Sequence, residues 1–157
     1  MNAPRPPGAI AIVAMGIVGG CAAPAPLAPP PPSDARVVVH VRGVPGDEGR
    51  VIVGLCADPS RWLTEGGYDF GATAPAQRDE IVVTVEGVSP GRYALSIFHD
   101  ANGNARLDRG AFGLPTEAWG FANNPRTLGP ASFQQAAIDV VAPETTVEIT
   151  LRPPLRP

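Results

Sequence analysis

The residues with the clearest chemical potential lie between His99 and Asp108. Side chains that carry oxygen occupy relative positions 1, 3, 5 and 9 of this stretch, namely Asp100, Asn102, Asn104 and Asp108. At relative position 7, Arg106 would contribute its backbone carbonyl. Oxygen atoms at these intervals can wrap around one hard cation, and calcium suits them best. The spacing therefore predicts a loop with a calcium site.

The stretch departs from the calcium loop of an EF-hand at two positions. Ala105 stands where glycine is usual, and Ala111 stands where a bidentate glutamate is usual. Two carboxylates predict weak binding, with a Kd of about 10⁻⁴ to 10⁻³ M. Glu117 adds a third carboxylate if the chain folds back. The alternative is a metal-free loop, in which Asp and Asn side chains accept hydrogen bonds from nearby backbone N–H groups.

Two aromatic residues form a second candidate site. Trp119 and Phe121 share one face if their segment is a strand, because Gly120 between them points the other way. They are either a stacking platform for a sugar or peptide or part of the core.

A hydrolase is a further alternative. His99, Asp100 and Glu117 could supply an acid and a base. The sequence contains no nucleophile elbow, zinc motif or phosphate-binding loop. We therefore expect no enzymatic activity and assign no catalytic residue.

The elements that position these residues are predicted to be strands. Runs rich in β-branched residues are separated by turn residues, and they cover 36–42, 49–56, 80–86, 92–99, 137–141 and 145–151. The short connections predict an opening hairpin from the first two runs and a closing pair from the last two. Residues 68–78 are rich in Gly and Ala and are predicted to be irregular. About seven strands indicate one all-β antiparallel sandwich, immunoglobulin-like or transthyretin-like in outline.

The N-terminal residues resemble a bacterial lipoprotein signal peptide. Residues 1–20 combine Arg5 with an apolar run that is too short to span a bilayer, and they end before Cys21. We expect cleavage there and lipidation of Cys21. Ala22 then favours the outer membrane, facing the periplasm or the cell surface. An ordinary signal peptide or a single anchor is the alternative.

The remaining chain divides into a tether, one domain and a tail. Residues 21–34 are dominated by Pro and Ala and predict an extended tether. Residues 35–151 have the size of one domain, and residues 152–157 are predicted to be a tail. The net charge of −3 and the absence of a basic stripe argue against nucleic-acid binding. Cys56 lies in an apolar strand pattern and is expected to be buried.

Several of these motifs together resemble the DUF2141 family of exported bacterial proteins. The resemblance rests on the order of Pro90–Ala94, His99–Asp108, Gly113–Asn124 and Ser132–Ala136. It covers about residues 37–151 and implies an exported β-sandwich module, but it implies no activity, substrate or catalytic residue. The family commonly has glycine where this chain has Ala105. If that position requires a positive φ, alanine is strained there by about 1 kcal/mol.

Three functions are compatible with these observations. The first is a membrane-tethered binding or scaffold module of the cell envelope, whose partner is an envelope protein or a glycan. The second is the hydrolase described above. The third is a purely structural envelope protein, in which the acidic loop only stabilises the fold.

Overall fold

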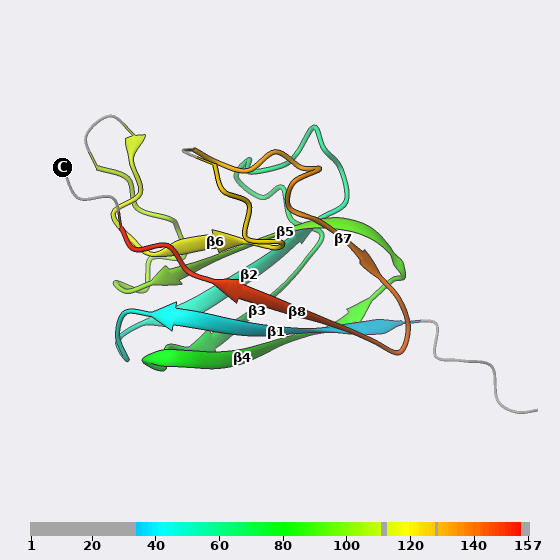
Figure 1. Cartoon of the computed structure of the whole chain (residues 1–157), viewed down its shortest axis with the longest axis horizontal. Helices are drawn as coiled ribbons and strands as arrows, with labels where there is room; N and C mark the ends of the chain where they lie inside the picture. The colour runs from blue at the N-terminus through cyan, green and yellow to red at the C-terminus, as the bar shows by residue number, and fades with distance from the viewer. Residues whose placement is uncertain (1–33, 111–112, 128, 155–157) are drawn as a thin grey trace, which may run out of the picture.

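A computed structural model describes residues 34–110, 113–127 and 129–154. The expected signal peptide, Cys21 and the tether up to residue 33 lie outside the described residues, as do residues 155–157 of the expected tail. The described part is a β-sandwich (Figure 1). Its strands are β1 (Ala35–Val44), β2 (Arg50–Cys56), β3 (Phe70–Pro75), β4 (Asp79–Val88), β5 (Gly91–Asp100), β6 (Trp119–Phe121), β7 (Ala137–Val140) and β8 (Glu144–Thr150).

The strands form two sheets. The three-stranded sheet has the order β4-β1-β8, and the five-stranded sheet has the order β3-β2-β5-β6, with β7 also paired to β5. The first and last strands, β1 and β8, run parallel, with Val39 opposite Val147. The other strand pairs are antiparallel. The prediction of an all-β sandwich is confirmed, with eight strands in place of about seven.

The two predicted local pairings are wrong. β1 and β2 lie in different sheets, and so do β7 and β8. The reason is that β1 is the central strand of its sheet, and both of its edges are already used by β4 and β8. The short connection after β1 therefore crosses from one sheet to the other.

The prediction of an irregular segment at residues 68–78 is also wrong. Part of it forms β3, which pairs along its length with β2 at the edge of the five-stranded sheet. Glycine is a weak β-former, but position 71 has little room for a side chain. A Cβ at Gly71 would lie only 2.9 Å from the carbonyl oxygen of Val53 in β2.

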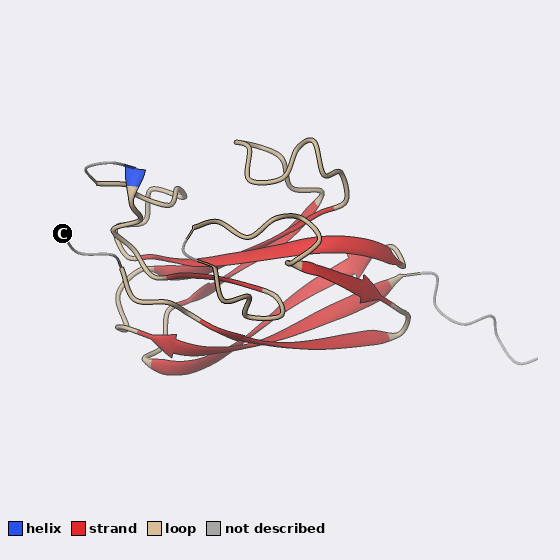
Figure 2. Ribbon diagram, turned by 45° about the horizontal axis from the view of Figure 1, so that its top comes forward, coloured by secondary structure: helices blue, strands red, loops and turns tan. Residues whose placement is uncertain are grey.

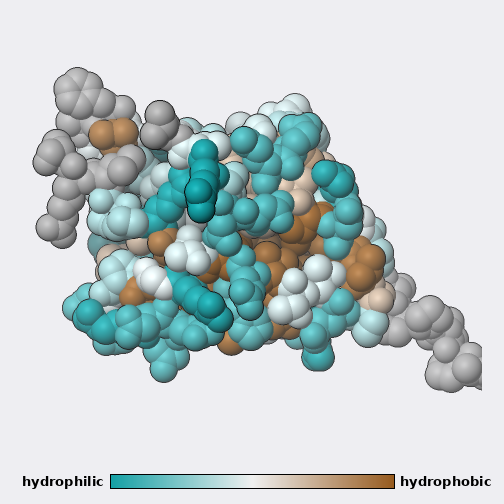
Figure 3. All heavy atoms as spheres, viewed as in Figure 1, coloured by the Kyte–Doolittle hydropathy of each residue, from teal (hydrophilic) through white to brown (hydrophobic). Residues whose placement is uncertain are grey.

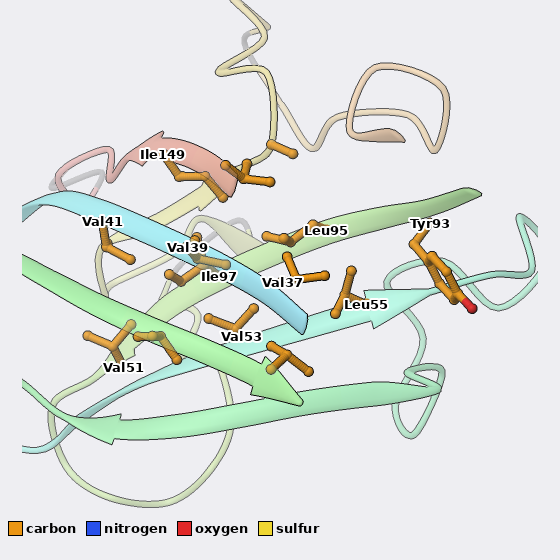
Figure 4. Packing of buried hydrophobic residues seen from close by; sticks show 14 of the residues in the cluster. Val37, Val39, Val41, Val51, Val53, Leu55, Tyr93, Leu95, Ile97 and Ile149 are labelled. Carbon is orange, nitrogen blue, oxygen red and sulfur yellow. The ribbon is translucent and has the colours of Figure 1, made fainter. Parts of the chain in front are cut away.

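The main core lies between the two sheets. Alternate residues of β1, β2 and β5 point into it, and Figure 4 shows Val37, Val39, Val41, Val51, Val53, Leu55, Leu95 and Ile97 packed together. Fully burying one such side chain contributes roughly 1.5–3 kcal/mol. Tyr93 ties this core to the preceding turn, because its hydroxyl donates to the carbonyl of Ser89 at 2.9 Å. The regular alternation fixes which residues of β5 face outward.

A second apolar layer lies on the outer face of the five-stranded sheet. The long loops gather on this side, away from the three-stranded sheet (Figures 1 and 2). Beneath them, a cluster contains Ala94, Trp119, Phe121, Ala131, Phe133, Ala136 and Ala137, with Trp62, Phe98 and Leu107 packed against it. Both faces of this sheet are therefore covered. In the view of Figure 3, apolar side chains are visible in gaps between polar ones.

Arg152 belongs to the fold, although the sequence placed it in the tail. Its backbone N–H donates to the carbonyl of Trp119 at 2.7 Å, and its guanidinium lies 5.0 Å from the centroid of the Trp119 ring. The same guanidinium donates to the carbonyls of Thr127 and Pro125. Within the described ranges, no helix has the length and apolar character needed to cross a membrane.

Candidate functional site

Asp100 ends β5 and anchors the acidic loop, which comprises residues 100–108. Its side chain is fully buried. Oδ1 accepts hydrogen bonds from the backbone N–H groups of Gly103 and Asn104, at 2.9 and 3.0 Å. Oδ2 accepts from the N–H of Ala105 and from Nε of Arg50, both at 2.9 Å. Arg50 comes from β2, so the loop is bonded directly to the neighbouring strand.

These bonds determine the charge of Asp100. Burial alone would raise the pKa of its carboxyl group. Hydrogen bonds from Arg50 and from three backbone N–H groups outweigh this effect, and the pKa lies below its ordinary value. Asp100 is therefore ionised at neutral pH, with its charge held inside a ring of donors.

The middle of the loop is a ladder of Asx hydrogen bonds. The amide oxygens of Asn102 and Asn104 accept from the backbone N–H groups of Asn104 and Arg106, at 3.1 and 2.9 Å. Their amide N–H₂ groups both donate to the carboxylate of Asp108, at 2.6 and 2.8 Å. Three of the four side chains that sequence analysis grouped together, Asn102, Asn104 and Asp108, bond directly to one another, and Asp100 bonds to the backbone of the same loop.

Glu117 folds back onto the loop and closes it. One carboxylate oxygen accepts from the N–H of Ala101 at the start of the loop, and the other accepts from the N–H of Asp108 at its end, both at 3.0 Å. Glu117 is only 8% exposed. It serves as a clamp that holds the two ends of the loop together.

The loop can therefore close without a metal. Both oxygens of Asp100 and both oxygens of Glu117 already accept hydrogen bonds. Among the described residues, no three His, Cys, Asp or Glu side chains are grouped so that they could hold a metal ion. The bonding favours the Asx-bonded alternative. Calcium binding stays the untested alternative, and a titration decides between the two.

His99 has a structural partner. Its Nε2 lies 2.7 Å from the carbonyl oxygen of Glu48, and the residue is 4% exposed. A carbonyl only accepts, so Nε2 carries the proton. The same connection approaches β5 closely, since a Cβ at Gly49 would lie 2.1 Å from the carbonyl oxygen of Asp100. His99 thus fixes the β1–β2 connection against the end of β5.

A cavity of about 740 Å³ lies beside the acidic loop, on the outer face of the five-stranded sheet. Its sheet-side lining includes Ile52, Phe98, Trp119 and Phe121, and its other lining comes from four loop segments: 63–66, 104–107, 109 with 113–115, and 129–130. The acidic loop is thus one wall of the cavity. His99, Asp100 and Glu117 are not among its lining residues.

Trp119 and Phe121 lie on the same face, as their spacing predicts. Each is 6% exposed, and their rings are 5.3 Å apart. They are buried in the second apolar layer, as core residues are, and they also line the cavity, as a stacking platform would. The indole Nε1 of Trp119 has no hydrogen-bond partner among the described residues. Sequence reasoning missed Tyr68 and Arg109, which line the same cavity from loops with no motif of their own.

Sequence comparison assigns the chain to a family. The chain matches the sequence profile of a family described as "Uncharacterized protein conserved in bacteria (DUF2141)" over residues 39–148. The chain belongs to the DUF2141 family. Comparisons with curated proteins and with solved structures found no match. The matched range contains the acidic loop, Glu117 and most residues of the cavity wall.

Several residues that carry the DUF2141 resemblance have structural roles here. Asn123 and Asn124 both have a positive φ, of 64° and 45°. The Asn123 amide donates to the carbonyls of Gln135 and Ala137, whereas Asn124 bonds to the backbone of β8. Ala105 has a φ of 63°. The position does require the left-handed conformation that disfavours alanine.

Proposed function

We propose that this DUF2141 protein is a membrane-tethered, non-enzymatic binding module of the bacterial cell envelope, and that its ligand occupies the cavity beside the acidic loop. The observation that carries the proposal is the cavity itself. Its volume of about 740 Å³ lies within the roughly 300–1,000 Å³ that is typical of small-molecule sites. Aromatic and aliphatic residues dominate its lining, as in most such sites.

The way the acidic loop is held supports this proposal. The loop is fixed at one end by the buried Asp100 carboxylate and at both ends by Glu117. A wall that is already ordered loses little entropy when a ligand binds, and this improves affinity. The acidic loop would thus contribute to binding by shaping the cavity.

The positions of the acid and base candidates favour binding over hydrolysis. The ring of His99 donates to a backbone carbonyl, and the carboxylates of Asp100 and Glu117 accept backbone N–H groups. A general acid or base must reach the group that reacts. These three residues do not line the cavity, so a ligand held there would not contact them.

The tether part of the proposal rests on the sequence. A lipid on Cys21 and a proline-rich segment up to residue 34 would hold the domain at the membrane, with the outer membrane as the expected location. The tether would also restrict partners of other surfaces of the domain, such as an envelope protein or a glycan, to that compartment.

A variant whose cavity is filled by a larger side chain tests the binding proposal. Ile52 is half-buried on the outer face of β2, and Ile52→Trp would fill the space beside it. The matched control is Val82→Trp on the other sheet, where the side chain is 49% exposed. Native mass spectrometry of the full chain purified from envelopes should show a bound small molecule in the wild type and control but not in Ile52→Trp.

Two results would count against the proposal. Equal ligand content in Ile52→Trp and the wild type, with both folded by circular dichroism, would exclude the cavity as the site. If all three proteins carry no ligand and acquire none from an envelope extract, the purely structural alternative is favoured.

A further inference from the structure

The polar groups around the cavity show which kind of ligand it would accept. Two of them satisfy each other, because the hydroxyls of Ser96 and Tyr68 are 3.0 Å apart. Two others form an ion pair at the opening, where Arg106 lies 2.7 Å from Glu65. These four residues need no partner from a ligand.

A further donor at the cavity wall is the guanidinium of Arg109. Arg109 is exposed and makes one bond, from Nη1 to the carbonyl of Gly113 at 3.1 Å. Within the described parts of the chain it forms no salt bridge, so its charge is not neutralised by a carboxylate. A ligand with an anionic acceptor group would satisfy the guanidinium of Arg109.

The charge at the cavity wall and the apolar lining both restrict the class of ligand that the cavity accepts. Arg106 and Glu65 cancel, which leaves the positive charge of Arg109 at the cavity wall. Guanidinium groups bind carboxylates and phosphates through paired hydrogen bonds. The rest of the lining offers Phe98, Phe121 and other apolar side chains. A glycan or a polar peptide would leave many of its own polar groups unpaired against this surface.

Resting on the binding function proposed above, we propose that the cavity accepts an anionic amphiphile, a small molecule with an apolar body and one carboxylate or phosphate group. The apolar body packs against the aromatic residues at the sheet. The anionic group lies at Arg109, on the wall next to the acidic loop.

A set of probes with one chain length tests the head group. Dodecanoate, dodecyl phosphate, dodecanol and dodecylammonium, each below its micelle concentration, are titrated into the full chain while tryptophan fluorescence is recorded. Trp119 lines the cavity, so binding should change the emission. We expect the two anions to bind more tightly than the alcohol, and the ammonium to bind most weakly. The stronger of the two anions identifies the preferred head group.

Two charge variants at the cavity should act in opposite directions. Arg109→Gln should weaken binding of the anions about three- to five-fold, the range of an exposed ion pair, and leave dodecanol unchanged. Glu65→Gln releases Arg106 from its partner and should tighten the anions by a similar factor. The control is Arg78→Gln, because Arg78 is also exposed but does not line the cavity. It should change nothing.

The outcomes separate the two proposals. If dodecanol binds as tightly as the anions, or if Arg109→Gln has no effect, the cavity remains a site but the anionic class is wrong. If a cationic or polar ligand is found in the protein purified from envelopes, the class is equally wrong. If no probe binds to the wild type, and Ile52→Trp behaves identically, the cavity is not a ligand site and both proposals fail.

Discussion

Asp100 has four hydrogen-bond donors around its carboxylate and no exposed surface. The pKa of this group lies below its ordinary value in the folded protein. A group with a depressed pKa stabilises the fold above the pKa of the unfolded chain, which is about 3.9. That contribution decreases as the pH falls below this value, towards the pKa of the folded state.

We therefore predict acid sensitivity that depends on Asp100. The wild-type melting temperature should fall between about pH 4 and pH 2 more steeply than that of Asp100→Asn. At neutral pH the variant should be less stable by roughly 2–3 kcal/mol, because an amide cannot accept all four donors. Thermal denaturation across this pH range measures both effects. Parallel pH profiles for the two proteins would contradict the role assigned to Asp100.

Ala105 carries strain that glycine would remove. Its φ of 63° lies in the left-handed region, which costs an ordinary residue about 1 kcal/mol. We predict that Ala105→Gly stabilises the domain by up to about 1 kcal/mol, measured by urea denaturation. Ala101→Gly is the control in the same loop, where φ is not positive, and it should be neutral or destabilising. If Ala105→Gly instead lowers the free energy of unfolding, other interactions already offset the strain of the positive φ at Ala105.

Among the elements, β8 depends on a side chain from outside its sheet. One edge of β8 pairs with β1, and Asn124 bonds to the other edge. Its amide donates to the carbonyl of Glu148 at 3.2 Å and accepts from the N–H of Thr150 at 2.8 Å. One asparagine side chain thus takes the place of a short piece of neighbouring strand.

Replacing this side chain should loosen β8. Asn124→Gly removes the side chain without straining the left-handed backbone at this position, where φ is 45°. It should cost about 1–2 kcal/mol of unfolding free energy, and the amide of Thr150 should exchange its hydrogen faster. Gln134→Ala, at an exposed position, is the control for removing a polar side chain. If the hydrogen-exchange rate of the Thr150 amide does not change, water replaces the Asn124 side chain at no cost in free energy.

The acidic loop is the element for which the metal question matters. Because its carboxylates already have donors, we predict no change in melting temperature up to several millimolar calcium. If calcium does bind with the weak affinity expected for two carboxylates, a concentration of ten times Kd stabilises the fold by about 1.4 kcal/mol. Such a shift, if absent with Asp108→Ala, would establish the calcium alternative.

Most strand positions were predictable from the sequence, but the pairing of the strands was not. The alternation of apolar and polar residues in β1 and β8 follows from burial on one face, and this pattern is visible in the residues themselves. Partner choice depends on which edges remain free after the whole chain has folded. The edge strand β3 was missed because Gly71 and its alanine neighbours have low β-propensity, and pairing with β2 overrides that preference.

At the scale of the whole molecule, the site was only partly predictable. The convergence of Asn102, Asn104 and Asp108 follows from their local spacing, whereas the sequence left open whether Glu117 folds back onto the loop. The cavity was not foreseen, because its walls come from loops that lie far apart in the sequence. No local pattern records that these loops meet over one face of a sheet. The aromatic pair Trp119 and Phe121 was the only signal that pointed to it.

The proposed membrane tether provides a prediction for the whole chain. Mass spectrometry of the mature protein should show an N-terminus at Cys21 that carries acyl chains, and the protein should fractionate with outer membranes. Cys21→Ser should release the domain from the membrane fraction while its melting temperature stays unchanged, because the folded strands begin at Ala35. An unmodified Cys21 in the mature protein would contradict the lipoprotein assignment.

The course of β1 separates the start of the described domain from the acidic loop. β1 begins at Ala35, runs for 10 residues and leads within a few residues to Arg50, which lies opposite Asp100. The acidic loop and the start of β1 are therefore at opposite ends of the sandwich (Figure 1). At about 3.3 Å per residue, the 10 residues of β1 span about 30 Å. If the chain is anchored through Cys21 as proposed, the acidic loop lies at the end of the domain remote from the end that the anchor joins.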